Sequence, residues 1–247
     1  MKKFLFLSLF TAVALNAEIL VYGPGGPAPV LKELAKQFEA KSGEKIIINA
    51  GPTPKWIKQA KIDADIIFSG NSSMMDGFIK MLPNQIKVED IQVLNARGSG
   101  MIVRANNPKK IKKFEDILKD GVKVMVVDGA GQVGLYEDMA LKTGKAENLE
   151  KLRKNIVVYA KNSKAAVDEW KNNQNIDVLI IWTHWIKAVG EKDNKFINAD
   201  KNSIIYRAAE IAPTQKGVKN PKVAEFIQFI QSKEAQKVWK KEGWLGR

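Results

Sequence analysis

The chain of 247 residues contains no cysteine and a single histidine, His184. Without cysteine there can be no disulfide, no thiolate metal site and no lipidated N-terminal cysteine. His184 alone would have to serve any histidine-dependent catalytic triad, and it has no partner within the spacing of a metal site. A Gly-x-Ser-x-Gly segment is also absent. The composition therefore predicts a protein that is not an enzyme and that carries neither a cofactor nor a metal.

Long apolar runs are absent after residue 17, but residues 1–17 have the pattern of a secretory signal peptide. Lys2 and Lys3 precede an apolar stretch, and small residues end at Ala17, where cleavage would leave Glu18 at the new N-terminus. The pattern at residues 12–14 offers a second cleavage site. We therefore expect export to the periplasm, where the mature chain would be soluble, with extracellular release as the weaker alternative.

Basic residues outnumber acidic ones, and the formal net charge of +13 becomes +11 when Lys2 and Lys3 leave with the signal peptide. A nucleic-acid binder would cluster its basic residues with interleaved aromatics. Here the lysines are dispersed, many of them on expected helix faces, so no nucleic-acid partner is predicted. A basic exported protein is better suited to attract anionic solutes or surfaces.

Short apolar runs alternate with segments of helical periodicity. In the first unit, the run at 19–21 stops at a Gly/Pro turn (22–27), and apolar residues then recur at helical spacing through Phe38. Further strands are predicted at 45–50, 64–68, 123–127, 156–160 and 178–182, and helices at 74–82, 113–119, 146–154, 164–172, 221–231 and 233–240, with others through Trp56 and Leu135. This alternation predicts an α/β protein with largely parallel sheets.

Two longer extended segments, at 91–105 and 203–212, bracket the central block of the chain. We interpret them as two crossover strands that join two lobes, with the C-terminal helices returning to the first lobe. The predicted division is residues 18–97 plus 208–247 for lobe 1 and residues 98–207 for lobe 2. Ligands of open α/β sheets bind beyond the carboxyl ends of the strands, so a ligand cleft is expected between the lobes.

Small or amide-bearing residues follow at least four of the predicted strands. Turns of this kind leave backbone N–H groups free at helix N-termini, where the macrodipole favours an anion. Helix capping alone would also explain each turn. Their candidate donors are Gly25, Gly26, Ser69, Asn71, Gly131, Gln132, Ser163 and Thr183.

Two arginines, Arg97 and Arg207, lie in the predicted crossover segments. A guanidinium group can bind a carboxylate, sulfate or phosphate through two hydrogen bonds, although either arginine could instead pair with an Asp or Glu side chain. Trp182 and Trp185 flank a strand end, where either could form a wall of the cleft.

Residues 129–134, GAGQVG, match the dinucleotide-binding fingerprint after a predicted strand. That fingerprint also requires an acidic residue at the end of the next strand, but the sequence there is Tyr159-Ala160-Lys161-Asn162. An anion-receiving turn is therefore the better interpretation of this segment.

Several motifs together resemble one family. They are VYGPGGP at 21–27, ADIIF at 64–68, GAG at 129–131, NIV at 155–157, Asn162-Ser163, WTHW at 182–185, Tyr206-Arg207 and the ending from SKEA at 232–235 to Gly243-Trp244. Over nearly all of the mature chain, the pattern resembles the accessory colonization factor AcfC-like branch of the class II periplasmic solute-binding proteins, related to molybdate and sulfate binders. Relative to that family, the turn after Gly131 is short and poor in Ser and Thr.

The resemblance implies a two-lobed fold with ligand contacts at Gly25, Gly26, Ser69, Gly131, Gln132, Ser163, Thr183 and Arg207. With the other candidates, the predicted ligand site consists of Gly25, Gly26, Ser69, Asn71, Arg97, Gly131, Gln132, Ser163, Thr183, Tyr206 and Arg207. The predicted function is capture of a small oxyanion or organic anion, such as sulfate or a phosphorylated or carboxylated metabolite, for uptake or colonization. An ABC-transporter membrane component is the expected partner for uptake. The alternatives are a surface adhesin for sulfated or acidic glycans and an exported enzyme that uses His184.

Overall fold

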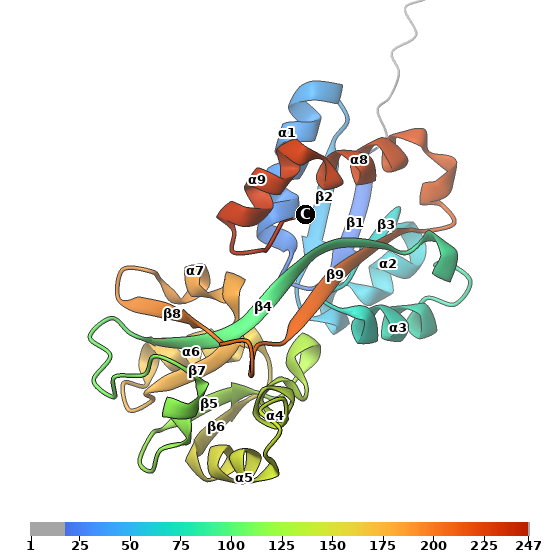
Figure 1. The fold of residues 1–247 in the computed structure, drawn as a ribbon. Helices are drawn as coiled ribbons and strands as arrows, with labels where there is room; N and C mark the ends of the chain where they lie inside the picture. The colour runs from blue at the N-terminus through green and yellow to red at the C-terminus, as the bar shows by residue number, and fades with distance from the viewer. Residues whose placement is uncertain (1–17, 247) are drawn as a thin grey trace, which may run out of the picture.

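Two long antiparallel strands run between the two halves of the molecule in the computed structural model, which describes residues 18–246 (Figure 1). The predicted signal peptide lies outside these residues. Strand β4 (Gln92–Arg104) pairs along its first half with β9 (Tyr206–Pro213), and Arg97 lies opposite Arg207 in that ladder. The second half of β4 leaves β9 and pairs with two other strands. Both crossover strands predicted from the sequence are confirmed.

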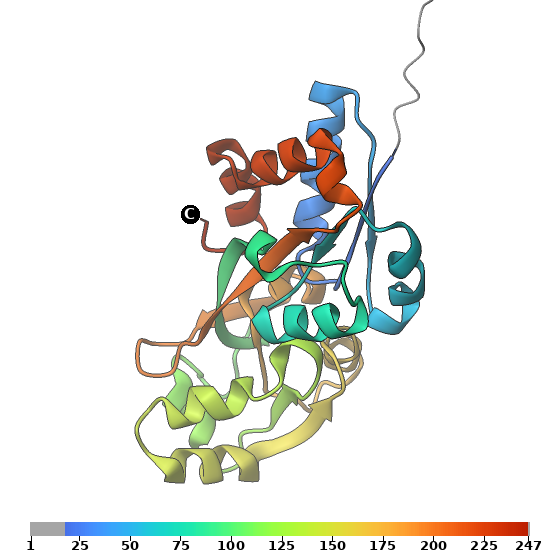
Figure 2. The same ribbon diagram turned by 90° about the vertical axis from the view of Figure 1, so that its right-hand side faces the viewer.

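The first lobe is built on a sheet with the order β2-β1-β3-β9. Strand β1 is parallel to β2 and β3, and β9 is antiparallel to β3. The elements of this lobe are β1 (Ile19–Gly23), α1 (Ala28–Ser42), β2 (Ile46–Ala50), η1 (Thr53–Lys55), α2 (Ile57–Asp63), β3 (Ile66–Phe68), α3 (Ser72–Met81), η2 (Val88–Asp90), η6 (Gly217–Lys219), α8 (Pro221–Gln231) and α9 (Lys233–Lys241). Helices α1, α8 and α9 pack on one face of the sheet and α2 and α3 on the other (Figure 2).

The second lobe continues the sheet from β4 through β7 and β5 to β6, with β8 on the other side of β4. Its parallel strands β5, β6 and β7 alternate with helices, as the sequence predicts. The elements are η3 (Phe114–Leu118), β5 (Val124–Val127), η4 (Ala130–Gln132), α4 (Leu135–Leu141), α5 (Ala146–Asn155), β6 (Ile156–Ala160), α6 (Ser163–Asn172), β7 (Val178–Trp182), η5 (Thr183–Trp185), α7 (Ile186–Val189) and β8 (Asn194–Asn198).

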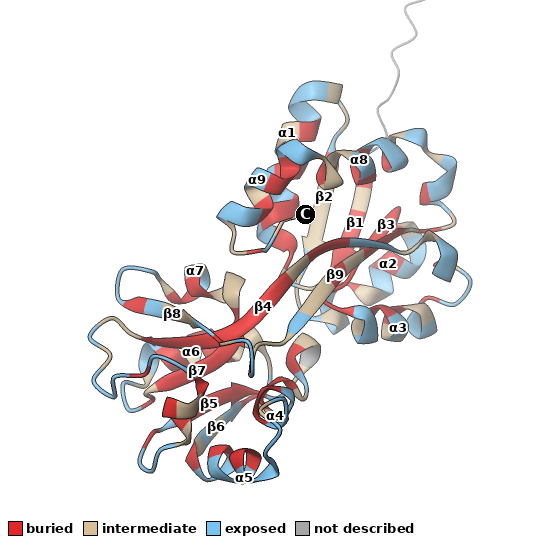
Figure 3. Ribbon diagram, viewed as in Figure 1, coloured by how far each residue is buried: buried red, intermediate tan, exposed pale blue. Residues whose placement is uncertain are grey.

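Buried apolar side chains form separate cores in the two lobes (Figure 3). The clusters of the first lobe draw on residues between Ile19 and Leu94 and between Ala209 and Trp244. Those of the second lobe draw on residues between Met101 and Ala199. The fold is therefore a two-lobed α/β architecture. The lobe boundaries predicted at 97/98 and 207/208 lie within or beside the crossover strands and stay a prediction.

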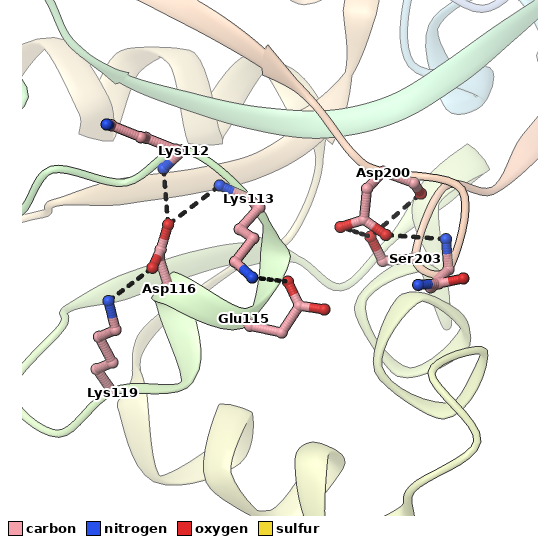
Figure 4. Close-up of polar contacts among 8 residues, drawn as sticks. Lys112, Lys113, Glu115, Asp116, Lys119, Asp200 and Ser203 are labelled. Atoms are coloured by element: carbon pink, nitrogen blue, oxygen red, sulfur yellow. Dashed lines mark hydrogen bonds and ion pairs between the residues drawn. The ribbon is translucent and has the colours of Figure 1, made fainter.

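The helix predicted at 113–119 is present only as the short 3-10 helix η3. Asp116 accepts hydrogen bonds from the backbone N–H groups of Lys112 (2.9 Å) and Lys113 (3.2 Å) and from Lys119 Nζ (2.6 Å; Figure 4). Burial would raise the pKa of Asp116, but these three hydrogen bonds hold it below its ordinary value. The side chain of Asp116 thereby stabilises both ends of a single tight turn. Hydrophobic periodicity in the sequence does not show such a contact.

Strand β8 was not expected from the sequence, and β9 begins later than predicted. A turn at residues 200–203 precedes β9, in which the hydroxyl of Ser203 donates to the carboxylate of Asp200 (3.2 Å; Figure 4). Within residues 18–246, no helix has both the length and the apolar character that a membrane span requires.

Candidate functional site

A cleft of about 510 Å³ lies between the lobes, where strands of both sheets end. Its walls are formed mainly by the turns that follow six strands. The lining residues are 24–27 after β1, 51–54 after β2, Gly70 and Met74 after β3, Gly131 and Gln132 after β5, 161–164 after β6, Trp182, His184 and Trp185 at the end of β7, and Arg97 and Trp244. Ligands of α/β sheets commonly bind at such strand ends, so this cleft is the candidate site.

Arg97 enters the cleft from β4 and is only 2% exposed. Its guanidinium group lies between two indole rings, 4.7 Å from the ring centre of Trp182 and 5.2 Å from that of Trp244. Nη1 donates a hydrogen bond to the carbonyl of Arg207 (3.0 Å), and Nε has no hydrogen-bond partner in the described chain. Burial, together with the charge of Arg207, lowers the pKa of Arg97 to about 9.

No carboxylate among residues 18–246 forms an ion pair with Arg97, and no Asp or Glu side chain lines the cleft. The charged lining residues are Arg97, Lys161 and Lys164, of which Lys164 pairs with Asp168 (2.6 Å). A buried cation without a counter-ion is costly. An anionic ligand would supply the missing charge.

The turns after β5 and β6 form the wall of the second lobe. Gln132 is 2% exposed, and its Nε2 donates to the hydroxyl of Ser163 (2.6 Å). Asn162 caps helix α6, since its Oδ1 accepts the N–H of Ala165 (2.9 Å). Gly129 allows the turn after β5 to pack closely against the turn after β6, because a Cβ at that position would lie 2.1 Å from the carbonyl oxygen of Lys161.

Contacts across the cleft meet at the carbonyl of Gly131. Asn71 Nδ2, from the first lobe, donates to this oxygen (3.2 Å), and so does Trp182 Nε1 (3.3 Å). A Cβ at Gly131 would lie 3.2 Å from the sulfur of Met74 and 4.0 Å from Arg97 Nη2. The two lobes thus touch beside the guanidinium group.

His184 follows β7 and lies against the C-terminal residues of the chain. Its ring stacks on that of Trp244, with the ring centres 4.8 Å apart and the planes 16° apart. Burial, and then the charge of Arg97, lower the pKa of His184 well below its ordinary range. The ring is therefore neutral at neutral pH.

Of the eleven residues predicted for the site, six line the cleft: Gly25, Gly26, Arg97, Gly131, Gln132 and Ser163. The other five, Ser69, Asn71, Thr183, Tyr206 and Arg207, are not among its lining residues. Asn71 caps α3 and contacts Gly131, and Thr183 donates to the carbonyl of Gly98 (2.7 Å). Ser69 is fully buried, whereas Tyr206 is 55% exposed.

Arg207 is held by Asp138, whose carboxylate is 2.6 Å from Nη2, and it also donates to the carbonyl of Val133 (3.2 Å). This is the ion-pair alternative considered from the sequence. Direct ligand contact stays a prediction for all eleven residues, of which six lie in the lining of the cleft.

The sequence pattern did not single out Lys161, the turn at 51–54 or Trp244 as part of the site. The turn at 51–54 also follows a strand, so the same strand-end rule would have found it. Trp244 has no such local signal, because its position depends on how the C-terminus packs on the first lobe. Among residues 18–246, no group of three or more His, Asp or Glu side chains is placed to hold a metal ion.

Comparison with known proteins agrees with this architecture. Residues 19–245 match the family model described as bacterial extracellular solute-binding protein. A search of curated proteins finds no match. The crystal structure of Peb3 from Campylobacter jejuni is 29% identical, with a TM-score of 0.84 over 93% of this chain and 100% of that one.

A crystal structure of PEB3 with bound L-phospholactate gives a TM-score of 0.85 at the same identity and coverage. The sulfate-binding protein SubI from Mycobacterium tuberculosis H37Rv shares the fold, with 16% identity and a TM-score of 0.74 over 93% of this chain and 86% of that one. The family match spans nearly the whole described chain. The chain therefore belongs to the bacterial extracellular solute-binding protein family.

Proposed function

We propose that this protein captures a small anionic metabolite in the cleft between its lobes. The observation that carries the proposal is Arg97, a guanidinium group that is 2% exposed and has no carboxylate partner in the described chain. Desolvation of such a charge is offset only when an opposite charge reaches it. In this cleft the ligand brings that charge.

Three kinds of group would replace the hydration shell of the anion. Arg97 and Lys161 supply positive charge, and the hydroxyl of Ser163 supplies a hydrogen-bond donor. The turns that precede α1 and α6 place helix N-termini at the cleft, where the helix dipole favours negative charge. These contacts come from both lobes, so the ligand favours the closed arrangement.

The ligand class follows from charge and size. A cleft of about 510 Å³ is within the range of sites for metabolite-sized molecules, about 300–1,000 Å³. Phosphorylated or carboxylated metabolites fill this volume better than bare sulfate does. The bound L-phospholactate of PEB3, a relative with 29% identity, supports the same class of ligand.

The cellular role extends the family assignment. We propose that residues 1–17 direct export and are cleaved, and that residues 18–97 plus 208–247 and residues 98–207 are lobes that close about β4 and β9. Delivery of the ligand to an ABC-transporter membrane component is the proposed use of binding, without catalysis, and the AcfC-like branch is the proposed subgroup. The adhesin alternative has no observation of its own in its support and is not proposed.

A thermal-shift screen tests the proposal, because a ligand that binds only the folded state raises its stability by mass action. Sulfate, molybdate, phosphate, 3-phosphoglycerate and citrate are compared at equal ionic strength. We expect a rise in melting temperature with at least one organic or phosphorylated anion, and loss of that rise in Arg97→Met. No shift with any of the five anions would contradict the proposal.

A further inference from the structure

Three polar atoms of two side chains in the wall of the cleft have no hydrogen-bond partner in the described chain. Both ring nitrogens of His184 are shielded from solvent and unpaired within residues 18–246, and so is Oε1 of Gln132. Both side chains line the cleft. Buried polar atoms are nearly always paired in a folded protein, so these atoms require a partner that the ligand can supply.

The ring of His184 is held in place on three sides. It stacks on Trp244 and lies 5.4 Å from the ring of Trp185. A Cβ at Gly26 would lie 3.2 Å from Nε2, so this nitrogen faces the turn after β1. The imidazole is therefore presented to the cleft in one orientation.

Burial, and then the charge of Arg97, lower the pKa of His184, so this imidazole is neutral at neutral pH. Binding of a dianion does not require a proton on the ring, since Arg97 and Lys161 already provide two positive charges without a carboxylate partner in the described chain. A neutral imidazole has one N–H donor and one acceptor nitrogen. An oxygen of the anion can accept a hydrogen bond from the N–H, but only a donor group of the ligand can pair the acceptor nitrogen.

Gln132 presents the second acceptor from the turn after β5. Its Nε2 donates to the hydroxyl of Ser163, and this hydrogen bond directs Oε1 away from Ser163. A carboxylate, sulfate or molybdate oxygen accepts hydrogen bonds but donates none. Such an anion would satisfy Arg97 and leave both acceptors unpaired.

We propose that the cleft selects an anion that also donates a hydrogen bond, namely a hydroxy acid or an anion with a protonated acid oxygen. His184 is the residue that accepts this hydrogen bond from the ligand. The inference rests on the proposed function and adds the second chemical feature of the ligand. Leaving a buried acceptor unpaired lowers affinity by about tenfold or more, which sets the expected selectivity.

Two matched pairs of anions test the proposal by isothermal titration calorimetry at pH 6.5. Malate differs from succinate by one hydroxyl group, and phosphate carries hydrogen at this pH whereas sulfate does not. We expect the wild-type protein to prefer malate and phosphate by about tenfold or more. In His184→Phe, which retains a ring to stack on Trp244, both preferences fall toward one. His184→Asn, which restores a donor and an acceptor, recovers the preference for malate.

Equal affinity within both pairs, or an unchanged preference in His184→Phe, would overturn the inference while leaving the proposed function in place. Uptake of a proton when sulfate binds would also overturn the inference. It is measured as a difference in binding enthalpy between buffers of unequal ionisation enthalpy. If His184→Phe does not fold, Gln132→Leu removes the other acceptor and is expected to reduce the same ratios. Failure of these four anions, of molybdate, of 3-phosphoglycerate and of citrate to bind would contradict the proposed function itself.

Discussion

Replacing Arg97 by methionine is expected to abolish anion binding without destabilising the empty protein. The guanidinium group is 2% exposed, has no carboxylate partner in residues 18–246, and lies between two tryptophan rings. Methionine is unbranched and flexible, so it can occupy much of the same space as an apolar side chain. The usual cost of truncating a buried residue should therefore not appear.

The magnitude follows from the pKa of Arg97, which is lowered to about 9. An exposed arginine has a pKa above about 12, and each pKa unit corresponds to about 1.4 kcal/mol, so the charged form in the empty cleft is disfavoured by roughly 4 kcal/mol. Methionine removes this penalty. It also removes one hydrogen bond, worth about 1 kcal/mol, and two contacts with indole rings, worth about 0.5–1 kcal/mol each. The net effect on the free energy of unfolding is a gain of roughly 1–2 kcal/mol.

Urea unfolding followed by tryptophan fluorescence measures both parts of this prediction, in buffer alone and with the best anion of the screen. At a ligand concentration of 100 times Kd, the wild-type protein should gain about 2.7 kcal/mol and Arg97→Met nothing. Arg207→Met is the matched control, since Arg207 lies opposite Arg97 on β9 but is paired with Asp138. It should lose less than about 1 kcal/mol and keep its response to the ligand. The reasoning is refuted if Arg97→Met loses more than about 2 kcal/mol when empty and still responds to the anion.

Three further predictions concern the surroundings of Arg97. Gly129→Ala should lower the free energy of unfolding by more than about 2 kcal/mol, because its Cβ would meet the carbonyl of Lys161 at 2.1 Å, whereas Gly25→Ala, with open space around its Cβ, should unfold like the wild type. Asn71→Asp keeps the cap of α3 but loses the hydrogen-bond donor to the carbonyl of Gly131. Calorimetry should therefore show weaker anion binding with little change in thermal stability. Unaltered affinity would contradict a role for that contact in binding. The pKa of His184 is lowered on folding, so the unfolded chain takes up the proton first as the pH falls below about 6.5. The free energy of unfolding of the wild type should therefore fall by up to about 1.4 kcal/mol per pH unit relative to that of His184→Asn. Parallel curves of stability against pH would show that the ring is not buried in its neutral form.

The overall fold could be predicted because its signals are local. Apolar runs, Gly/Pro turns and helical periodicity give the order of strands and helices, and the two long extended segments give the crossover strands. The two differences from the predicted elements have one local and one distant cause. Asp116 accepts hydrogen bonds from the backbone N–H groups of Lys112 and Lys113 and from the side chain of Lys119, and the segment forms a short 3-10 helix in place of the longer helix expected. Strand β8 forms only because the second half of β4 offers it an edge.

The site was less predictable, since strand-end turns show where donors lie but not which of them the ligand can reach. Arg97 and Arg207 both come from predicted crossover segments and lie opposite each other, yet of the two only Arg97 lines the cleft. The difference is made by Asp138 on α4, which is far along the chain from Arg207 and pairs with it. His184 lies in the wall of the cleft with its ring stacked on that of Trp244, and this contact depends on the tertiary packing of the C-terminus.

A crystal structure of the protein grown with 3-phosphoglycerate tests the central claim most directly. The account predicts an anionic group within hydrogen-bond distance of the Arg97 guanidinium, enclosed by the turns at 24–27 and 161–164. An anion found only on the surface, with the Arg97 guanidinium and the cleft around it free of ligand in a protein that binds the compound in solution, would contradict it.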